Sequence, residues 1–137
     1  MDFHRIHYCA KKYSYDCLRL SIGIIFIWFG ILKCLKESPA QDLVMHALPW
    51  SANLLWVFWI GIWEVLIGLC FIIKKTLKFG LVLFFLHIPG TFLPLIFAPE
   101  HCFISAPFLL TLEGQYIFKN LITIASAFVL VGSLEKK

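Results

Sequence analysis

The chain has 137 residues, of which 61% are hydrophobic and only 15% are charged, and its mean hydropathy is +0.86. Soluble domains are closer to half apolar and a quarter charged, so this composition excludes an ordinary water-soluble domain. It indicates an integral membrane protein with one compact domain, residues 1–137. The net charge of +4 comes from basic residues that flank apolar stretches, which is typical of contact with lipid head groups and not with nucleic acid.

Four apolar stretches are long enough to cross a bilayer, at about residues 17–34, 53–73, 77–97 and 114–134. Most lysines and arginines lie before the first span, between the second and third, or after the fourth. By the positive-inside rule, both termini and the link from Lys74 to Lys78 are cytoplasmic. The predicted fold is an all-α bundle of four transmembrane helices.

The first span carries a stripe of small and basic residues. Arg19, Gly23, Phe26, Gly30 and Lys33 recur at alternating spacings of four and three, so they share one helical face. The two glycines predict that this face packs closely against another helix.

The second and third spans each contain one polar residue that stands out. Glu64 shares a face with Gly61 and Gly68, and a carboxylate at mid-membrane depth costs roughly 2.5–3.5 kcal/mol unless it has a partner. His87 lies about as far after the basic link as Glu64 lies before it. Two antiparallel helices would therefore hold the two side chains at nearly the same depth.

This pair has two interpretations. It could bind a proton or contact a ligand, because both side chains can take up a proton and burial shifts their pKa values. It could instead be an interhelical hydrogen bond that holds two helices in register. No third ligand lies at the same depth, so we expect no metal site there. Pro89, which follows His87, removes a helical hydrogen bond and predicts a kink.

The fourth span opens with polar residues. Thr111 is a suitable N-cap, and Glu113 in the first turn suits the positive end of the helix dipole. Tyr116, Lys119 and Asn120 continue a polar stripe along the helix. Such a stripe predicts contact with protein or water instead of lipid.

Lys33, Glu113 and Lys119 are expected together near the outer face. They could form a pocket open to the outside that receives an anionic or polar head group. Alternatively, the two lysines extend to the lipid head groups and Glu113 neutralises one of them.

Two cysteines, Cys34 and Cys102, are also expected at the outer face, where an oxidising compartment permits a disulfide. The alternative is that both are small apolar side chains. His46 and His101 lie in the outer loops, and we expect them to be solvated and not to bind a metal ion.

Several segments resemble the DoxX-like family of small bacterial membrane proteins: His87–Pro94, Leu112–Leu121, Arg19–Lys33 and Trp63–Gly68. The resemblance extends over about residues 17–134. It implies a multi-pass protein of the bacterial inner (plasma) membrane. Named relatives include small subunits tied to thiosulfate–quinone oxidoreduction and a membrane protein linked to reactive-chlorine resistance, so it also implies a redox or oxidant-stress setting. It transfers no established catalytic residues to this chain.

Three functions are therefore considered. The leading hypothesis is a membrane protein of redox physiology that binds a small lipophilic or anionic ligand, such as a quinone, between its helices. In this hypothesis it acts with a protein partner or a second copy, for example as an accessory subunit of a quinone-linked oxidoreductase. Glu64 and His87 would handle a proton or bind the ligand, while Lys33, Glu113 and Lys119 would shape the outer mouth. The alternatives are a small proton-coupled transporter or channel, and a non-catalytic scaffold.

Overall fold

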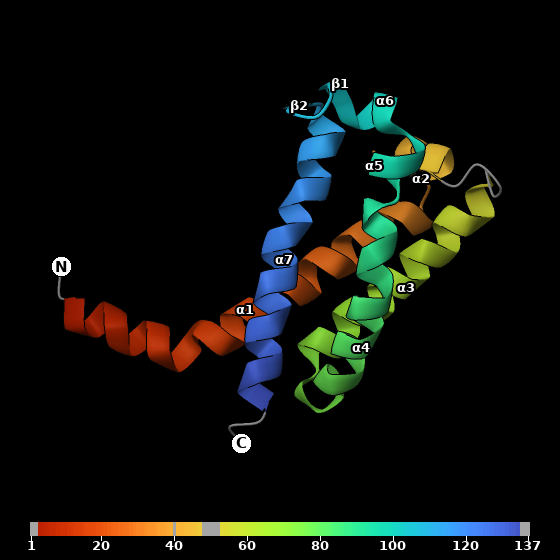
Figure 1. Cartoon of the computed structure of the whole chain (residues 1–137). Coiled ribbons are helices and arrows are strands. Elements are labelled where there is room, and N and C mark those ends of the chain that lie inside the picture. The colour runs from red at the N-terminus through yellow and green to blue at the C-terminus, as the bar shows by residue number, and fades with distance from the viewer. Residues whose placement is uncertain (1–2, 40, 48–52, 135–137) are drawn as a thin grey trace.

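The computed structural model describes residues 3–39, 41–47 and 53–134 and is almost entirely helical (Figure 1). In chain order its elements are α1 (Phe3–Cys34), α2 (Gln41–Ala47), α3 (Leu54–Ile72), the 3₁₀ turn η1 (Lys74–Thr76), α4 (Leu77–His87), the 3₁₀ segment η2 (Ile88–Phe92), α5 (Pro94–Phe97), α6 (Pro99–Cys102), β1 (Phe103–Ser105), β2 (Leu109–Leu110) and α7 (Leu112–Leu134).

Within the described residues, four helical segments are long and apolar enough to cross a membrane: Ile6–Cys34, Leu54–Ile72, Lys74–Phe97 and Leu112–Leu134. The helical class is therefore confirmed, and so is the presence of four helices that are long and apolar enough to span a membrane. The first helix begins earlier than its predicted span, because it continues through the basic segment. The loop predicted after the third span contains α6 and a short antiparallel hairpin, β1–β2.

The closest contact in the bundle is between α1 and α3, which run antiparallel. Two glycines on each helix, about two turns apart, face one another. A Cβ atom added at Gly68 would lie 2.6 Å from the carbonyl oxygen of Gly23, and one added at Gly61 would lie 2.7 Å from that of Gly30. The predicted close packing of the glycine stripe is confirmed, because only residues without a side chain permit this approach.

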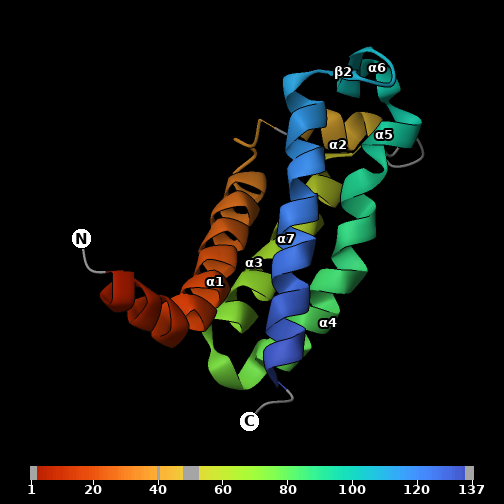
Figure 2. The ribbon, with the colours of Figure 1, turned by 60° about the vertical axis from the view of Figure 1, so that its left-hand side comes forward.

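The apolar core lies in the half of the bundle that contains the α3–α4 link. Its largest fully buried side chains include Phe71 and Phe84, and α7 contributes Ala127 and Leu130. Figure 2 shows α7 running in front of the other long helices. Leu134 at the end of α7 and Leu18 of α1 both pack against this core, so α7 ends at the same end of the bundle as the α3–α4 link.

Arg19 of α1 binds the C-terminal end of α3. Its buried guanidinium donates to the carbonyl oxygens of Phe71 and Ile72 and lies 3.4 Å from Asp16, which in turn lies 3.0 Å from Lys74. The last carbonyls of a helix have no partner within the helix. A cation at this position satisfies them and stabilises the negative end of the dipole of α3.

The third span is interrupted as Pro89 predicts. The α-helix ends at His87, and η2 carries the chain to Leu93 before α5 begins at Pro94. Proline cannot donate to the preceding turn, so the helix changes its winding at this point.

The α1–α3 contact predicts a position-specific effect of added methyl groups. Gly68→Ala should lower the free energy of unfolding by about 1–3 kcal/mol, because the new Cβ atom would overlap the backbone of α1. Gly132→Ala is the matched control, since no described residue of a neighbouring helix lies within 4 Å of its Cβ position. Unfolding in mixed micelles followed by circular dichroism measures both. Equal stability of the two variants would contradict the close packing.

Candidate functional site

Glu64 is the centre of a buried polar group that joins three helices. It projects from α3 and is only 7% exposed. Lys33 Nζ of α1 donates to its Oε2 atom at 2.5 Å, and His87 Nε2 at the end of α4 lies 3.2 Å from its Oε1 atom. An ionised carboxylate only accepts hydrogen bonds, so both neighbours donate when Glu64 is ionised. The predicted meeting of Glu64 and His87 inside the protein is confirmed as a contact.

The predicted place of Lys33 is wrong. The sequence placed it in an outer cluster with Glu113 and Lys119, whereas its ammonium is buried against Glu64. Lys33 lies on the same stripe as Gly30, and this stripe faces α3. Its side chain is therefore directed toward the Glu64 carboxylate. The ion pair of Lys33 and Glu64 compensates two charges that would otherwise be costly to bury.

The rest of the predicted outer cluster is also not formed. Glu113, Tyr116 and Lys119 are exposed on α7. Lys119 Nζ lies 4.7 Å from the ring centre of Tyr116, a cation–π contact. Among the described residues, no ion pair joins Glu113 to either lysine. Thr111 does cap α7 as predicted, since its hydroxyl oxygen accepts from the Gly114 amide at 3.1 Å.

Asn120 belongs to a second polar contact that connects α7 to the third span. Its Nδ2 atom donates to Thr91 Oγ1 at 3.0 Å, and the Thr91 hydroxyl donates to the Ile88 carbonyl at 2.7 Å. Thr91 lies about one turn after His87. The sequence placed Asn120 on a polar stripe of the fourth span, but it did not predict the contact with Thr91, because the relative height of the two residues depends on how α7 packs.

Aromatic rings cover one side of the charged group. The ring of Phe26 packs edge-on against His87 with centroids 6.1 Å apart, and against Phe84 at 5.6 Å. The His87 side chain is 11% exposed. Gly90, three residues after His87, is exposed, and no described residue outside its own turn lies within 4 Å of a Cβ position there. The charged group is therefore covered by Phe26 on one side.

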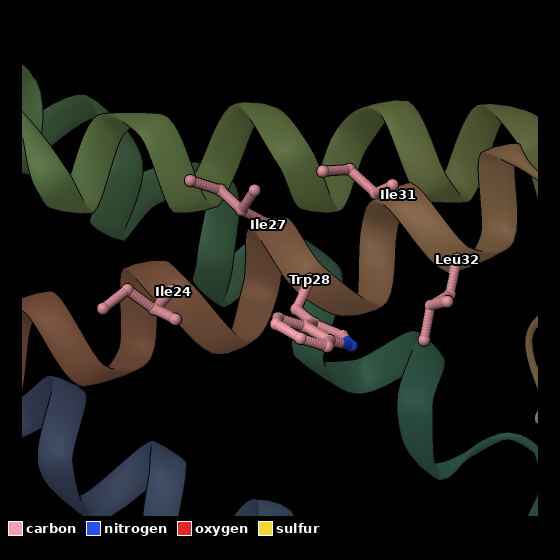
Figure 3. A pocket seen from close by; sticks show the side chains of 5 residues that line it. All are labelled: Ile24, Ile27, Trp28, Ile31 and Leu32. Carbon is pink, nitrogen blue, oxygen red and sulfur yellow. The ribbon is translucent and has the colours of Figure 1, made fainter.

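A separate hollow of about 380 Å³ lies on α1 (Figure 3). Its lining consists of apolar residues of α1: Ile24, Ile27, Trp28, Ile31 and Leu32. These positions lie on a different face from Gly23, Gly30 and Lys33. The hollow is therefore not part of the Glu64 site.

The Cys34–Cys102 disulfide, one of the two interpretations of these residues, is not formed, since all five cysteines have free thiols and all five lie in the described part of the chain. Cys34 Sγ is directed at the Phe58 carbonyl, at 3.8 Å. Cys102 is buried at the end of α6, and this burial, with Glu113 and Glu100 nearby, raises the pKa of its thiol. The two cysteines thus behave as small apolar side chains, the alternative interpretation.

The two loop histidines meet at the surface. The rings of His46 and His101 lie 4.4 Å apart, and His46 Nδ1 is 2.7 Å from the Asp42 carbonyl oxygen. Among the residues that the structure describes, no three or more His, Cys, Asp or Glu side chains are grouped in a way that could hold a metal ion.

No protein-family model, curated protein or solved structure shows significant similarity to this chain. The functional argument therefore rests on the residues themselves. They place one carboxylate, one ammonium and one imidazole in contact inside an apolar bundle, an arrangement that can hold a proton or bind a polar group.

The ion pair predicts a strong coupling between Lys33 and Glu64. Glu64→Gln should lower the free energy of unfolding by about 3–5 kcal/mol, because it leaves the Lys33 ammonium buried without a counter-charge. The double variant Lys33→Met/Glu64→Gln should recover most of this loss. Lys119→Met, which removes an exposed lysine that forms no ion pair with any residue the structure describes, should stay within about 0.5 kcal/mol of the wild type.

Unfolding in mixed micelles provides these values. If the double variant were as unstable as Glu64→Gln, the stability of the bundle would not depend on compensation of the two charges.

Proposed function

We propose that this protein is a multi-pass protein of a bacterial inner membrane, with both termini cytoplasmic, that binds a small lipophilic ligand at the group formed by Lys33, Glu64 and His87. A quinone is the ligand class that fits best. The observation that carries the proposal is the position of Glu64, whose two oxygens are held by an ammonium and an imidazole within the bundle.

The donors of this group match the chemistry of a quinone. A quinone carbonyl accepts hydrogen bonds, and both Lys33 and His87 are donors that could turn from Glu64 toward it. Reduction of a quinone takes up protons together with electrons, and a carboxylate beside an imidazole can supply and recover a proton. Gly90, three residues after His87, is exposed, so a ligand head group would approach His87 from the side of the helix break.

The cellular setting of the proposal comes from the sequence. The segments that resemble DoxX-like proteins support a role in redox or oxidant-stress physiology, with the chain acting as a partner or accessory subunit of a quinone-linked oxidoreductase. The excess of lysine and arginine on one side of the spans supports the orientation with both termini inside.

Binding of a short-chain quinone to the protein in nanodiscs tests the ligand. His87→Gln should weaken binding about tenfold, because the glutamine amide keeps only a neutral donor and cannot take up and release a proton as the imidazole does, and Glu64→Gln should do so as well. Ser126→Ala is the control, since its hydroxyl donates to the Ile122 carbonyl of its own helix in an exposed hydrogen bond. Calorimetric titration gives the dissociation constants. Unchanged binding in folded His87→Gln and Glu64→Gln protein would exclude this group as the quinone site.

A proton-coupled transporter or channel is the second candidate, and the helix break beside the charged group favours it. Transporters commonly place substrate and ion sites where a spanning helix is interrupted, and here η2 follows His87 directly. In proteoliposomes with an imposed pH gradient, this candidate predicts a proton flux that His87→Gln reduces at least tenfold while Ser126→Ala leaves it unchanged. Absence of flux above that of protein-free vesicles would exclude it.

A further inference from the structure

The first part of α1 lies outside the helical bundle. In Figures 1 and 2 it projects away from the other helices, and every side chain described between residues 3 and 14 is exposed. A membrane span needs about 20 residues, whereas α1 has 32. About 12 residues, or about 18 Å of helix, therefore extend beyond the span.

This segment has two chemically distinct faces. Phe3, Ile6, Ala10 and Tyr13 recur at spacings of three and four, so they form an apolar stripe. Phe3 is 79% exposed and Tyr13 is 51% exposed, so no part of the bundle covers the stripe. In soluble surroundings such a stripe would be packed against a core.

The opposite face is basic. It contains Lys11 and Lys12 together with His4 and Tyr8, and residues 3–14 include no Asp or Glu. Lys12 Nζ lies 5.1 Å from the ring centre of Tyr13 and 6.0 Å from that of Tyr8. Lysine and tyrosine side chains in contact are typical of the level of lipid head groups.

The segment leaves the bundle beside other basic residues. Asp16, just after the segment, lies 3.0 Å from Lys74. Lys74, Lys75 and Lys78 in the α3–α4 link are all exposed. The basic face of residues 3–14 and this link are therefore at the same end of the bundle, next to the end of the membrane span.

We propose that residues 3–14 of α1 lie along an anionic lipid surface, with the apolar stripe at the boundary of the acyl chains and Lys11 and Lys12 at the phosphates. A helix with an apolar face and a lysine-rich face binds in this way, and lysines near an anionic leaflet add to the affinity. The inference rests on the proposed membrane insertion of α1 and is independent of the ligand at Glu64.

An environment-sensitive dye attached at residue 10 tests the inference. The full chain, with its five native cysteines replaced by alanine, carries Ala10→Cys on the apolar stripe or Tyr8→Cys on the basic face as the matched control. Each is reconstituted in nanodiscs of phosphatidylcholine alone or with 30% phosphatidylglycerol, as a typical anionic content. Recovery of helical protein in the discs tests insertion separately.

The expected result is a blue-shifted, lipid-like emission from residue 10 in the anionic discs and a water-like emission from residue 8. Lys11→Glu/Lys12→Glu should lower the fraction of segments bound to the surface at least tenfold, because each lysine contributes about fivefold. Equal emission from the two positions, or emission that responds neither to phosphatidylglycerol nor to charge reversal, would overturn the inference while leaving insertion intact. Protein that is not recovered in discs of either composition would overturn the proposed insertion as well.

Discussion

The structure depends on compensation of a carboxylate charge inside an apolar bundle. Glu64 is buried among apolar helices. A buried carboxylate is costly unless polar groups of the protein contact its oxygens. Lys33 on α1 and His87 on α4 make these contacts with the two Glu64 oxygens. The requirement determines which faces of α1, α3 and α4 can meet and at what relative height, because a shift by one turn would separate the charges.

The same stripe of α1 supplies the charged contacts and the glycine contacts with α3. Arg19 binds the last carbonyls of α3 at one end, Gly23 and Gly30 permit backbone contact in the middle, and Lys33 binds Glu64 near the other end. Each charged contact needs the close approach that the glycines allow, and the two backbones stay close because the charges at both ends are paired. Stability and the candidate site therefore share one interface, so substitutions at the site have to be measured for folding as well as for binding.

The polar contacts are not equally distributed among the helices. The ion pair lies within the α1–α3–α4 group, while α7 is joined to it by the neutral hydrogen bond from Asn120 to Thr91 and by apolar packing. The winding of the third span changes between these two contacts, at Pro89.

The sequence alone determined the helical class, the four apolar segments, the glycine stripe, the break at Pro89 and the meeting of Glu64 with His87. Each of these follows from helical periodicity or from distance along the chain, which are local properties. Only the tertiary structure decided that Lys33 pairs with Glu64, that Arg19 caps α3 and that Asn120 bonds Thr91. A lysine or arginine side chain can reach in several directions from its backbone position, and which acceptor it meets depends on the rotation and tilt of the neighbouring helix. Hydropathy and spacing do not contain that information.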